Sequence, residues 1–259
     1  MEKEKLNLAI APVFSVVTVT YNAGKVLEGT LQSVLQQSYS NWEYIIIDGG
    51  SKDATLDIIQ RHAEKLSYWV SEPDKGLYDA MNKGLKKATG DYVIFLNAGD
   101  SLADVDSLAD LARIAEEDHF PDIMYGETDL VDVDGRFVAH RRLKAPQHLN
   151  WKSFRMGMLV CHQAFIAKRT IAPLYDLQYR FSADFDWCIR CMKVAENIRN
   201  AEQVLIHYLN EGMTTANRKA SLKERYHIMQ KYYGKIRVLL LHLWFAFRFY
   251  WARLVGKTL

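Results

Sequence analysis

The sequence has few cysteines for its length, three among 259 residues. This number is too small for a disulfide framework and favours a protein of a reducing compartment. We also expect no secretory signal, because Met1-Glu-Lys-Glu-Lys5 precedes only a short apolar patch. Both observations favour a cytoplasmic protein.

The C-terminal apolar run is too short to cross a bilayer. Residues 238–247 form a stretch of ten residues without formal charge, which ends at Arg248. A membrane-spanning helix needs about 20 predominantly apolar residues. Arg248 and Arg253 would also cost about 2.5–3.5 kcal/mol each near mid-membrane. This run therefore predicts a surface helix and excludes a transmembrane one.

Two common nucleotide-binding motifs are absent. No G-x-G-x-x-G follows the first apolar run, and no G-x-x-x-x-G-K-[ST] occurs anywhere in the chain. The first motif is typical of dinucleotide-dependent dehydrogenases and the second of P-loop enzymes. Both classes of protein are therefore unlikely matches for this sequence, and any nucleotide site must be built in another way.

Apolar, β-branched runs alternate with helical patterns over the first hundred residues. We expect strands at residues 13–19, 43–47, 67–70 and 92–96, each followed by a helix. The run 92–96 is apolar throughout, as in a strand that is buried on both faces. This β-α alternation predicts an α/β fold with a parallel sheet and right-handed crossovers.

Polar and aromatic side chains stand at the ends of these strands. Ligands of open α/β sheets gather beyond the carboxyl ends of the strands. An aromatic face there can stack on a base, carboxylates can bind base and ribose donors, and a lysine can neutralise phosphate. Each residue also has a structural alternative as a turn residue, a solvated charge or a helix cap. The residues concerned are Tyr21, Asp48, Asp53, Lys75 and Asp100.

Five short motifs together resemble the family 2 glycosyltransferases, most closely the bacterial enzymes that build surface polysaccharides. The resemblance covers residues 13–210. It implies a GT-A fold, which is a Rossmann-like, mostly parallel sheet with helices on both faces, and an inverting enzyme that uses a nucleotide sugar. The motifs are Val19-Thr-Tyr-Asn22, Asp48-Gly-Gly-Ser-x-Asp53, Ser71-Glu-Pro-Asp-x-Gly76, Ala80-x-Asn82-x-Gly84 and Gly90-Asp-x-x-x-Phe-Leu96.

The resemblance implies a divalent cation, Mg²⁺ or Mn²⁺, with Asp100 in the place of the metal-binding acid. The family usually shows two or three acids where this chain has Asn97-Ala-Gly-Asp100. One carboxylate together with substrate phosphates can still hold Mg²⁺. His207 is a second candidate ligand, with an ordinary strand residue as the alternative. The implied nucleotide-sugar-binding residues are Thr20, Tyr21, Asn22, Asp48, Lys75, Asn82 and Asn97.

The second half of the chain mixes strands and helices. We expect strands at 122–125, 157–167 and 201–209, and a hairpin of 129–133 with 136–140 around Asp134-Gly135. The strand 157–167 carries His162 and Gln163, which the resemblance places on the acceptor side. The alternative for His162 is a hydrogen-bonded, half-buried strand residue.

Asp184 occupies the place of the catalytic base in the resembled family. The family carries an acid pair there, and this chain has Ala183-Asp184. In an inverting transfer a carboxylate accepts the proton of the attacking hydroxyl. The structural alternative for Asp184 is a helix N-cap. Further along, residues 211–214 replace a glycine-rich turn of the family that lies near the donor diphosphate.

Cys188 and Cys191 offer a different interpretation. Trp187-Cys-Ile-Arg-Cys191 has the spacing of thiol oxidoreductases and of half a zinc site, to which Cys161 and His162 could be added. On a helix the two thiols are three residues apart, so a buried apolar stripe also accounts for them. We favour the stripe, since a redox domain would leave the strand-end residues unexplained.

The C-terminal segment differs from the rest of the chain in charge. From Arg218 onward ten Lys and Arg residues face one acid, Glu224, which gives +9, whereas the other 23 basic and 30 acidic residues give −7. We interpret the segment as basic helices lying on an anionic membrane surface, with a terminal helix packed on the domain or a second subunit as the alternative. The aromatic residues expected at the headgroups are Trp244, Phe245, Phe247, Phe249, Tyr250 and Trp251, and the basic ones are Lys231, Lys235, Arg237 and Arg253.

Taken together, the sequence predicts a GT-A domain over 1–217, with a nucleotide-sugar half (13–100) and an acceptor half (101–217), and a membrane-associating segment over 218–259. We expect sugar transfer from a nucleotide-diphosphate sugar, with UDP favoured, to a glycan or lipid-linked acceptor at the inner face of the cell membrane. A non-catalytic nucleotide-sugar-binding homologue is the alternative. A homo-oligomer is compatible with the sequence, and the aromatic residues around the basic ones argue against nucleic acid as the partner.

Overall fold

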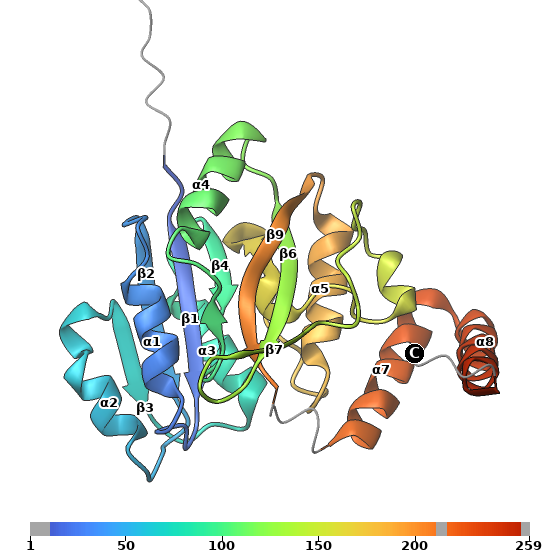
Figure 1. Cartoon of the computed structure of the whole chain (residues 1–259), viewed down its shortest axis with the longest axis horizontal. Helices are drawn as coiled ribbons and strands as arrows, with labels where there is room; N and C mark the ends of the chain where they lie inside the picture. The colour runs from blue at the N-terminus through green and yellow to red at the C-terminus, as the bar shows by residue number, and fades with distance from the viewer. Residues whose placement is uncertain (1–10, 211–216, 255–259) are drawn as a thin grey trace, which may run out of the picture.

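The computed structural model describes residues 11–210 and 217–254, without the side chains of 218, 248–250 and 252–254. Its strands form one mixed sheet in the order β3-β2-β1-β4-β8-β6-β9-β5, with β7 paired to β6 (Figure 1). The strands are β1 Phe14–Thr20, β2 Trp42–Asp48, β3 Tyr68–Ser71, β4 Tyr92–Phe95, β5 Ser101–Leu102, β6 Ile123–Val131, β7 Phe137–His140, β8 Phe165–Lys168 and β9 Ile198–Leu209. The helices are α1 Leu27–Leu35, α2 Thr55–Arg61, α3 Leu77–Lys87, α4 Ser107–Glu117, α5 Ala183–Val194, α7 Arg218–Tyr233 and α8 Lys235–Leu254, with 3-10 helices η1 Ala63–Lys65, η2 Ser153–Met156, η3 His162–Ala164 and η4 Arg169–Ile171.

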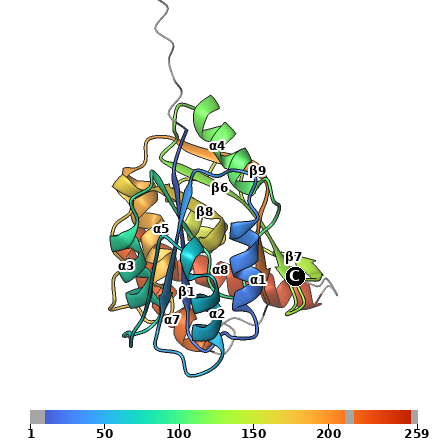
Figure 2. The same ribbon diagram turned by 90° about the vertical axis from the view of Figure 1, so that its left-hand side faces the viewer.

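The first half of the chain is the predicted parallel βα unit. Strands β3, β2, β1 and β4 pair in parallel. All seven residues of β1 and all four of β4 are buried, as expected for strands covered on both faces. Figure 2 shows α1 on one side of the sheet and α3 with α5 on the other. The predicted α/β class is confirmed.

The second half extends the sheet with antiparallel strands. β8 pairs antiparallel with both β4 and β6, whereas β9 runs parallel to β6. The segments predicted as strand 122–125 and strand 129–133 are parts of one longer strand, β6. The predicted hairpin is present, and Gly135 in its turn adopts φ +76°, a conformation that favours glycine.

The predicted strand 157–167 is wrong over most of its length. Only β8, at its end, is extended, and His162 lies in η3. The Arg141 guanidinium donates hydrogen bonds to the carbonyls of Met158 and Leu159 at 2.5 and 2.9 Å. Because a side chain satisfies these backbone oxygens, the apolar segment can be buried without pairing in the sheet.

An aromatic layer lies between the sheet and α5. Trp187 of α5 is fully buried and stacks on Tyr175 at a centroid distance of 5.2 Å. Phe95 of β4 meets the Trp187 ring edge-on at 5.8 Å, and the Trp187 indole N–H donates to the Pro173 carbonyl at 2.7 Å. Buried aromatic pairs of this kind contribute about 0.5–1.5 kcal/mol beyond area burial. They fix the position of α5 against the end of β4.

α7 packs against α5, whereas α8 extends to the side of the molecule (Figure 1). Lys231 of α7 donates to the buried Asp186 carboxylate at 3.1 Å, and the Tyr232 hydroxyl donates to the same oxygen at 2.8 Å. The Lys231 ammonium group, predicted to lie toward anionic lipid, forms an ion pair with Asp186 while its side chain stays 47% exposed. The predicted C-terminal segment therefore contacts α5 through α7.

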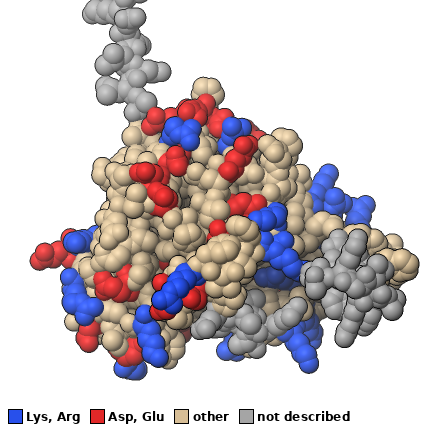
Figure 3. Space-filling view, viewed as in Figure 1, with Lys and Arg blue, Asp and Glu red and all other residues tan. Residues whose placement is uncertain are grey.

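α8 carries an exposed apolar surface. Figure 3 shows Lys and Arg side chains along the right-hand edge of the molecule, where α7 and α8 lie. Within 11–210 and 217–254, no helix is both long enough and apolar enough to pass through a bilayer. The large apolar side chains exposed on α8 are Ile236, Leu239, Leu240, Leu243, Trp244, Phe247 and Trp251.

Two helical glycines provide a test of how α3 packs on the sheet. A Cβ atom at Gly84 would lie 2.3 Å from Cγ1 of Val17 in β1, whereas a Cβ at Gly29 of α1 would meet nothing within 4 Å. We expect Gly84→Ala to lower the free energy of unfolding by about 1–3 kcal/mol through overpacking. Gly29→Ala should raise it by about 0.5–1 kcal/mol through helix propensity.

Urea unfolding followed by circular dichroism measures both changes. Equal effects of the two substitutions would show that α3 does not approach β1 as closely as described.

Candidate functional site

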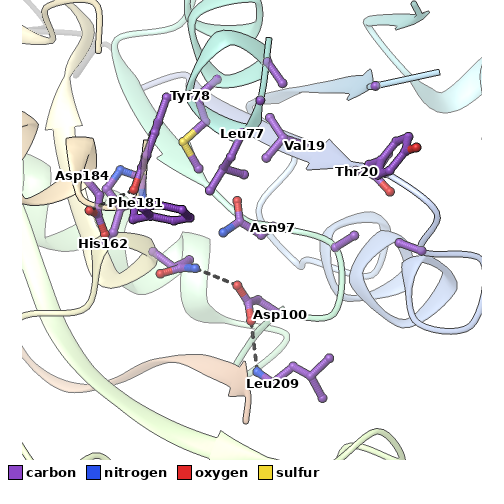
Figure 4. A pocket seen from close by; sticks show the side chains of 18 of the residues that line it. Val19, Thr20, Leu77, Tyr78, Asn97, Asp100, His162, Phe181, Asp184 and Leu209 are labelled. Carbon is purple, nitrogen blue, oxygen red and sulfur yellow. Dashed lines mark hydrogen bonds between the residues drawn. The ribbon is translucent and has the colours of Figure 1, made fainter. Parts of the chain in front are cut away.

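A cavity of about 1160 Å³ opens at the carboxyl ends of β1 and β4. Its walls come from the strand ends, α3, the turn after β4, η3 and the start of α5. Two residues of the C-terminal segment, Asn217 and Arg225, also line it. Figure 4 shows Thr20 and Asp184 at opposite ends of the labelled side chains, with Asn97 and Asp100 between them. The cavity thus brings together residues from both halves of the chain.

One end of the cavity is a slot beside Tyr21. The Tyr21 ring is 63% exposed, and Gly49 faces it so closely that a Cβ there would lie 3.3 Å from the ring and 2.6 Å from an Asp74 oxygen. The Thr20 hydroxyl is buried without a hydrogen-bond partner among the described residues. A flat aromatic face, a glycine wall and an unpaired hydroxyl suit a planar polar ligand.

Three predicted residues support this slot from behind. Asn22, with φ +49°, accepts a hydrogen bond from the Lys52 N–H at 2.9 Å. Asp48 is fully buried, and its carboxylate accepts hydrogen bonds from the backbone and hydroxyl of Ser51 and from the Ser71 hydroxyl. Neither Asn22 nor Asp48 lines the cavity. Asp53 is not the predicted N-cap of α2, because that position is Ala54, and it joins two loops by accepting hydrogen bonds from the N–H groups of Gly24 and Thr55.

Lys75 and Asn82 also lie outside the cavity lining. The neighbour of Lys75, Asp74, lines the cavity instead, and the sequence analysis missed it. Asn82 is buried on α3, where its amide donates to the Tyr175 carbonyl at 3.0 Å and accepts from the Tyr175 N–H at 2.7 Å. Both polar atoms of Asn82 therefore hold another chain segment, and the geometry gives it a supporting position.

Asp100 lies at the middle of the cavity, in the turn after β4. Its two carboxylate oxygens accept hydrogen bonds from the Leu209 N–H at 3.0 Å and the Gln163 amide at 2.8 Å (Figure 4). Burial raises the pKa of Asp100 to about 7, and these two hydrogen bonds oppose the shift. Gly99, at φ +101°, lets the turn approach Leu209, which a Cβ would meet at 2.7 Å. The close turn places the carboxylate against β9.

The described residues contain no group of three or more His, Cys, Asp or Glu side chains that could hold a metal ion. His207 is paired with Ser101 across β9 and β5 and does not line the cavity. Asn97 does line it, and its buried side-chain oxygen has no partner among the described residues. Asp100 and Asn97 are oxygen donors and fit a hard cation that also takes substrate phosphates. The predicted turn at 211–214 lies outside the described residues.

Asp184 stands at the other end of the cavity, in the first turn of α5. Ser182 is the N-cap of this helix, so Asp184 is not the cap. Its Oδ1 accepts hydrogen bonds from the Tyr78 hydroxyl at 3.1 Å and the Phe185 N–H at 2.8 Å. The side chain is partly exposed and lines the cavity. A carboxylate in this position can meet a ligand that enters from the acceptor half.

His162 and Gln163 lie between the two acids. The His162 ring is buried and bonds to the Tyr175 hydroxyl at 2.6 Å. Burial lowers the pKa of His162 to about 4, so the imidazole is neutral near pH 7. Gln163 donates to Asp100 and accepts from the Cys161 thiol at 3.0 Å. Both residues line the cavity, and both hold other side chains in place.

The three cysteines are in an environment that disfavours a reactive thiolate. Cys161, Cys188 and Cys191 are unpaired and buried. Burial raises the pKa of the Cys188 and Cys191 thiols, which disfavours the reactive thiolate. The buried stripe explains this pair, and the thiol oxidoreductase interpretation has no support from the geometry.

The comparisons with known proteins agree with this geometry. The sequence model of the family described as Glycosyl transferase family 2 matches residues 15–172. A "PGL/p-HBAD biosynthesis glycosyltransferase" of Mycobacterium bovis is 35% identical over 212 residues, which is 78% of each chain. A "putative teichuronic acid biosynthesis glycosyltransferase" of Bacillus subtilis, TuaG, is 42% identical over 92 residues, 34% of this chain and 36% of TuaG.

Solved structures share the fold. S. aureus TarS 1-349 in complex with UDP has a TM-score of 0.67 and 18% identity, over 88% of this chain and 69% of that one. The same TarS fragment in complex with UDP-GlcNAc has a TM-score of 0.66 and 21% identity, over 84% of this chain and 64% of that one. With the family match, the chain belongs to glycosyltransferase family 2 and has the GT-A fold.

Proposed function

We propose that this glycosyltransferase moves a sugar from a nucleotide-diphosphate donor, with UDP favoured, to a hydroxyl of a glycan or lipid-linked acceptor, with inversion. One observation carries the proposal: Asp100 and Asp184 line the same cavity as the exposed Tyr21 face and the unpaired Thr20 hydroxyl. A donor-side acid, an acceptor-side acid and a slot for a base are the parts that such a transfer needs.

The slot at Tyr21 is the proposed site of the nucleotide base and ribose. Tyr21 offers a stacking face, Thr20 offers a hydroxyl, and Asp74 offers an acceptor for ribose or base N–H and O–H groups. Asp48 and Asn22 act through the loops that they hold. The complexes of TarS with UDP and with UDP-GlcNAc support a uridine nucleotide as the donor.

The donor diphosphate is proposed to lie over the turn after β4. Asp100 and the side-chain oxygen of Asn97 would hold a Mg²⁺ or Mn²⁺ ion there together with phosphate oxygens. Such an ion, when bound, would neutralise charge that develops on the departing diphosphate. Because the protein supplies few ligands, we expect weak metal binding without the nucleotide.

Asp184 is proposed as the general base. It would accept the proton of the acceptor hydroxyl while the hydroxyl oxygen forms a bond to the anomeric carbon. The bond from that carbon to the diphosphate breaks on the opposite side, and its electron pair leaves with the nucleotide. The Tyr78 hydroxyl donates to Oδ1 of Asp184 and so orients the carboxylate.

We propose cell-surface polysaccharide or glycolipid synthesis as the setting, supported by the names of the mycobacterial and Bacillus relatives. The exposed apolar side chains of α8 and the neighbouring basic residues support contact with the inner face of the cell membrane. Amphipathic helices of this composition lie in the headgroup region, attracted to anionic lipid.

Replacement of the proposed base separates an enzyme from a binding protein. Asp184→Asn keeps the shape and removes the proton acceptor. We expect turnover to fall by two or more orders of magnitude with donor binding near wild type. Donor consumption with UDP-sugars and calorimetric UDP binding measure the two quantities, with the exposed Asp57→Asn on α2 as the control.

Equal turnover of Asp184→Asn and wild type would contradict the assignment of the base. Absence of turnover in the wild type with every donor would favour the non-catalytic nucleotide-sugar-binding homologue.

Replacement of Asp100 tests the cation. UDP should bind the wild type more tightly with Mn²⁺ than with a chelator, and Asp100→Ala should lose most of this difference. The buried carboxylate has a pKa of about 7, so the Mn²⁺-dependent part of binding should weaken as the pH falls from 8 to 6. Calorimetric titrations at both pH values measure it, and an unchanged Mn²⁺ effect in Asp100→Ala would leave that residue a purely structural role.

The membrane proposal is tested on the exposed side of α8. Substitution of Leu243, Phe247 and Trp251 by Ser removes apolar side chains that are 58%, 64% and 59% exposed. We expect the triple variant to lose cosedimentation with vesicles of phosphatidylglycerol and phosphatidylcholine while it still binds UDP. Phe137→Ser, at an exposed position of β7, is the control. Unaltered vesicle binding would show that these side chains of α8 do not contact the membrane. A dimer in the wild type that the substitutions dissociate would show that they form a protein interface.

A further inference from the structure

Two arginines at the Asp184 end of the cavity have no anionic partner in the part of the chain that the structure describes. Arg180 precedes α5 and Arg225 belongs to α7, and both line the cavity beside Asp184. Among the described residues neither guanidinium forms an ion pair, and each lies over a phenylalanine ring, at 5.6 Å from Phe181 and 5.9 Å from Phe185. The Nε atom of Arg225 is buried and has no hydrogen-bond partner among the described residues.

Two other arginines that reach into the protein have partners, although the buried Nη2 atom of Arg190 also lacks a hydrogen-bond partner among the described residues. Arg190 pairs with Asp186 at 2.6 Å, and Arg141 donates to three backbone carbonyls. A buried guanidinium N–H without an acceptor is costly, and two like charges at one end of a cavity repel each other. Arg180 is exposed to solvent, so it is the buried Nε atom of Arg225, at the wall of the cavity, that indicates a ligand.

The fold holds this end of the cavity in place. Both oxygens of the Glu224 carboxylate accept backbone hydrogen bonds, from Arg180 N–H at 2.9 Å and from Phe181 N–H at 2.8 Å. The Ser182 hydroxyl contacts Ser221 of α7 as well. Glu224 is thus committed to the backbone and does not neutralise the adjacent Arg225. α7 joins the two arginines into one site.

Arg225 is also close to the proposed base. Burial and the Asp184 charge raise the pKa of the Tyr78 hydroxyl, whereas the Arg225 charge lowers it. Tyr78 donates to Asp184, and the Arg225 guanidinium lies over the ring of Phe185, the residue after Asp184, so Arg225 is near the end of the cavity that holds the proposed base. Asp184 lies at the opposite end of the labelled side chains from Thr20 (Figure 4).

We propose that Arg180 and Arg225 bind a phosphoryl group of a substrate beside Asp184. The inference rests on the proposed function and specifies one of its ligands. Planar guanidinium groups match the oxygens of phosphate and give strong, charge-assisted hydrogen bonds. The phosphoryl group is either part of a phosphate-bearing acceptor or the diphosphate of the donor, and the two sources can be separated by experiment.

The test compares Arg180→Gln, Arg225→Gln and Arg225→Lys with the control Arg136→Gln, an exposed position of the β6–β7 turn. Calorimetry measures the binding of UDP, of uridine, and of inorganic phosphate with and without saturating UDP. A phosphate-bearing acceptor predicts that the Gln variants lose phosphate binding tenfold or more with UDP affinity unchanged. A donor diphosphate predicts a tenfold or greater loss of UDP affinity with uridine binding unchanged. Arg225→Lys, which keeps the charge, should lie between Arg225→Gln and wild type.

Two further outcomes decide the matter. If all three variants bind UDP and phosphate as the control does, the arginine site is refuted. If the wild type binds phosphate but not UDP, the uridine donor of the proposed function is wrong. The arginine site is then supported if the Gln variants lose phosphate binding and refuted if they keep it. Thermal unfolding of each variant distinguishes a lost contact from a lost fold, and Arg180→Gln remains informative if Arg225→Gln does not fold.

Discussion

The turn after β4 depends on a buried carboxylate that connects the two halves of the chain. Asp100 accepts one hydrogen bond from β9 and one from η3, both of which come from the second half. Without these bonds the carboxylate would be desolvated and unpaired, which costs several kcal/mol. The two hydrogen bonds of Asp100 hold the second half of the chain against the turn after β4. The carboxyl ends of the parallel strands then face the start of α5, and the cavity lies between them.

α5 is the second element on which the site depends, and it is held from both sides. The Trp187 aromatic layer fixes it to β4, and α7 binds the residues just before α5 through Glu224 and the first turn of α5 through Asp186. The C-terminal segment that differs most in charge from the rest is thus the one that positions the acceptor end. Its only acid, Glu224, serves this purpose, and that isolated acid was the one sequence signal of a structural role.

Local patterns predicted the parallel half well. The apolar runs of β1 and β4 are buried on both faces, and their length and the following turns identify them. The prediction of a strand at 157–167 was wrong because Arg141, which precedes this segment in the sequence, donates hydrogen bonds to the carbonyls of Met158 and Leu159. The sequence could place Asp100 and Asp184 by motif, but not the partners of Asn82 or the exposure of Lys75. Arg180, Arg225 and Asp74 were missed because only the folded chain brings them to the cavity.

The buried Asp186 has a consequence for how such enzymes can be recombined. Its carboxylate is shared by Arg190 of the same helix and by Lys231 and Tyr232 of α7. Removal of the α7 partners from a fully buried carboxylate would cost on the order of 3 kcal/mol, a large part of the stability of a typical domain. A C-terminal segment exchanged between related enzymes at residue 218 would therefore lack side chains that match the buried Asp186. Exchange is expected to succeed only after Gly234, where α8 begins and the shared carboxylate keeps all its donors.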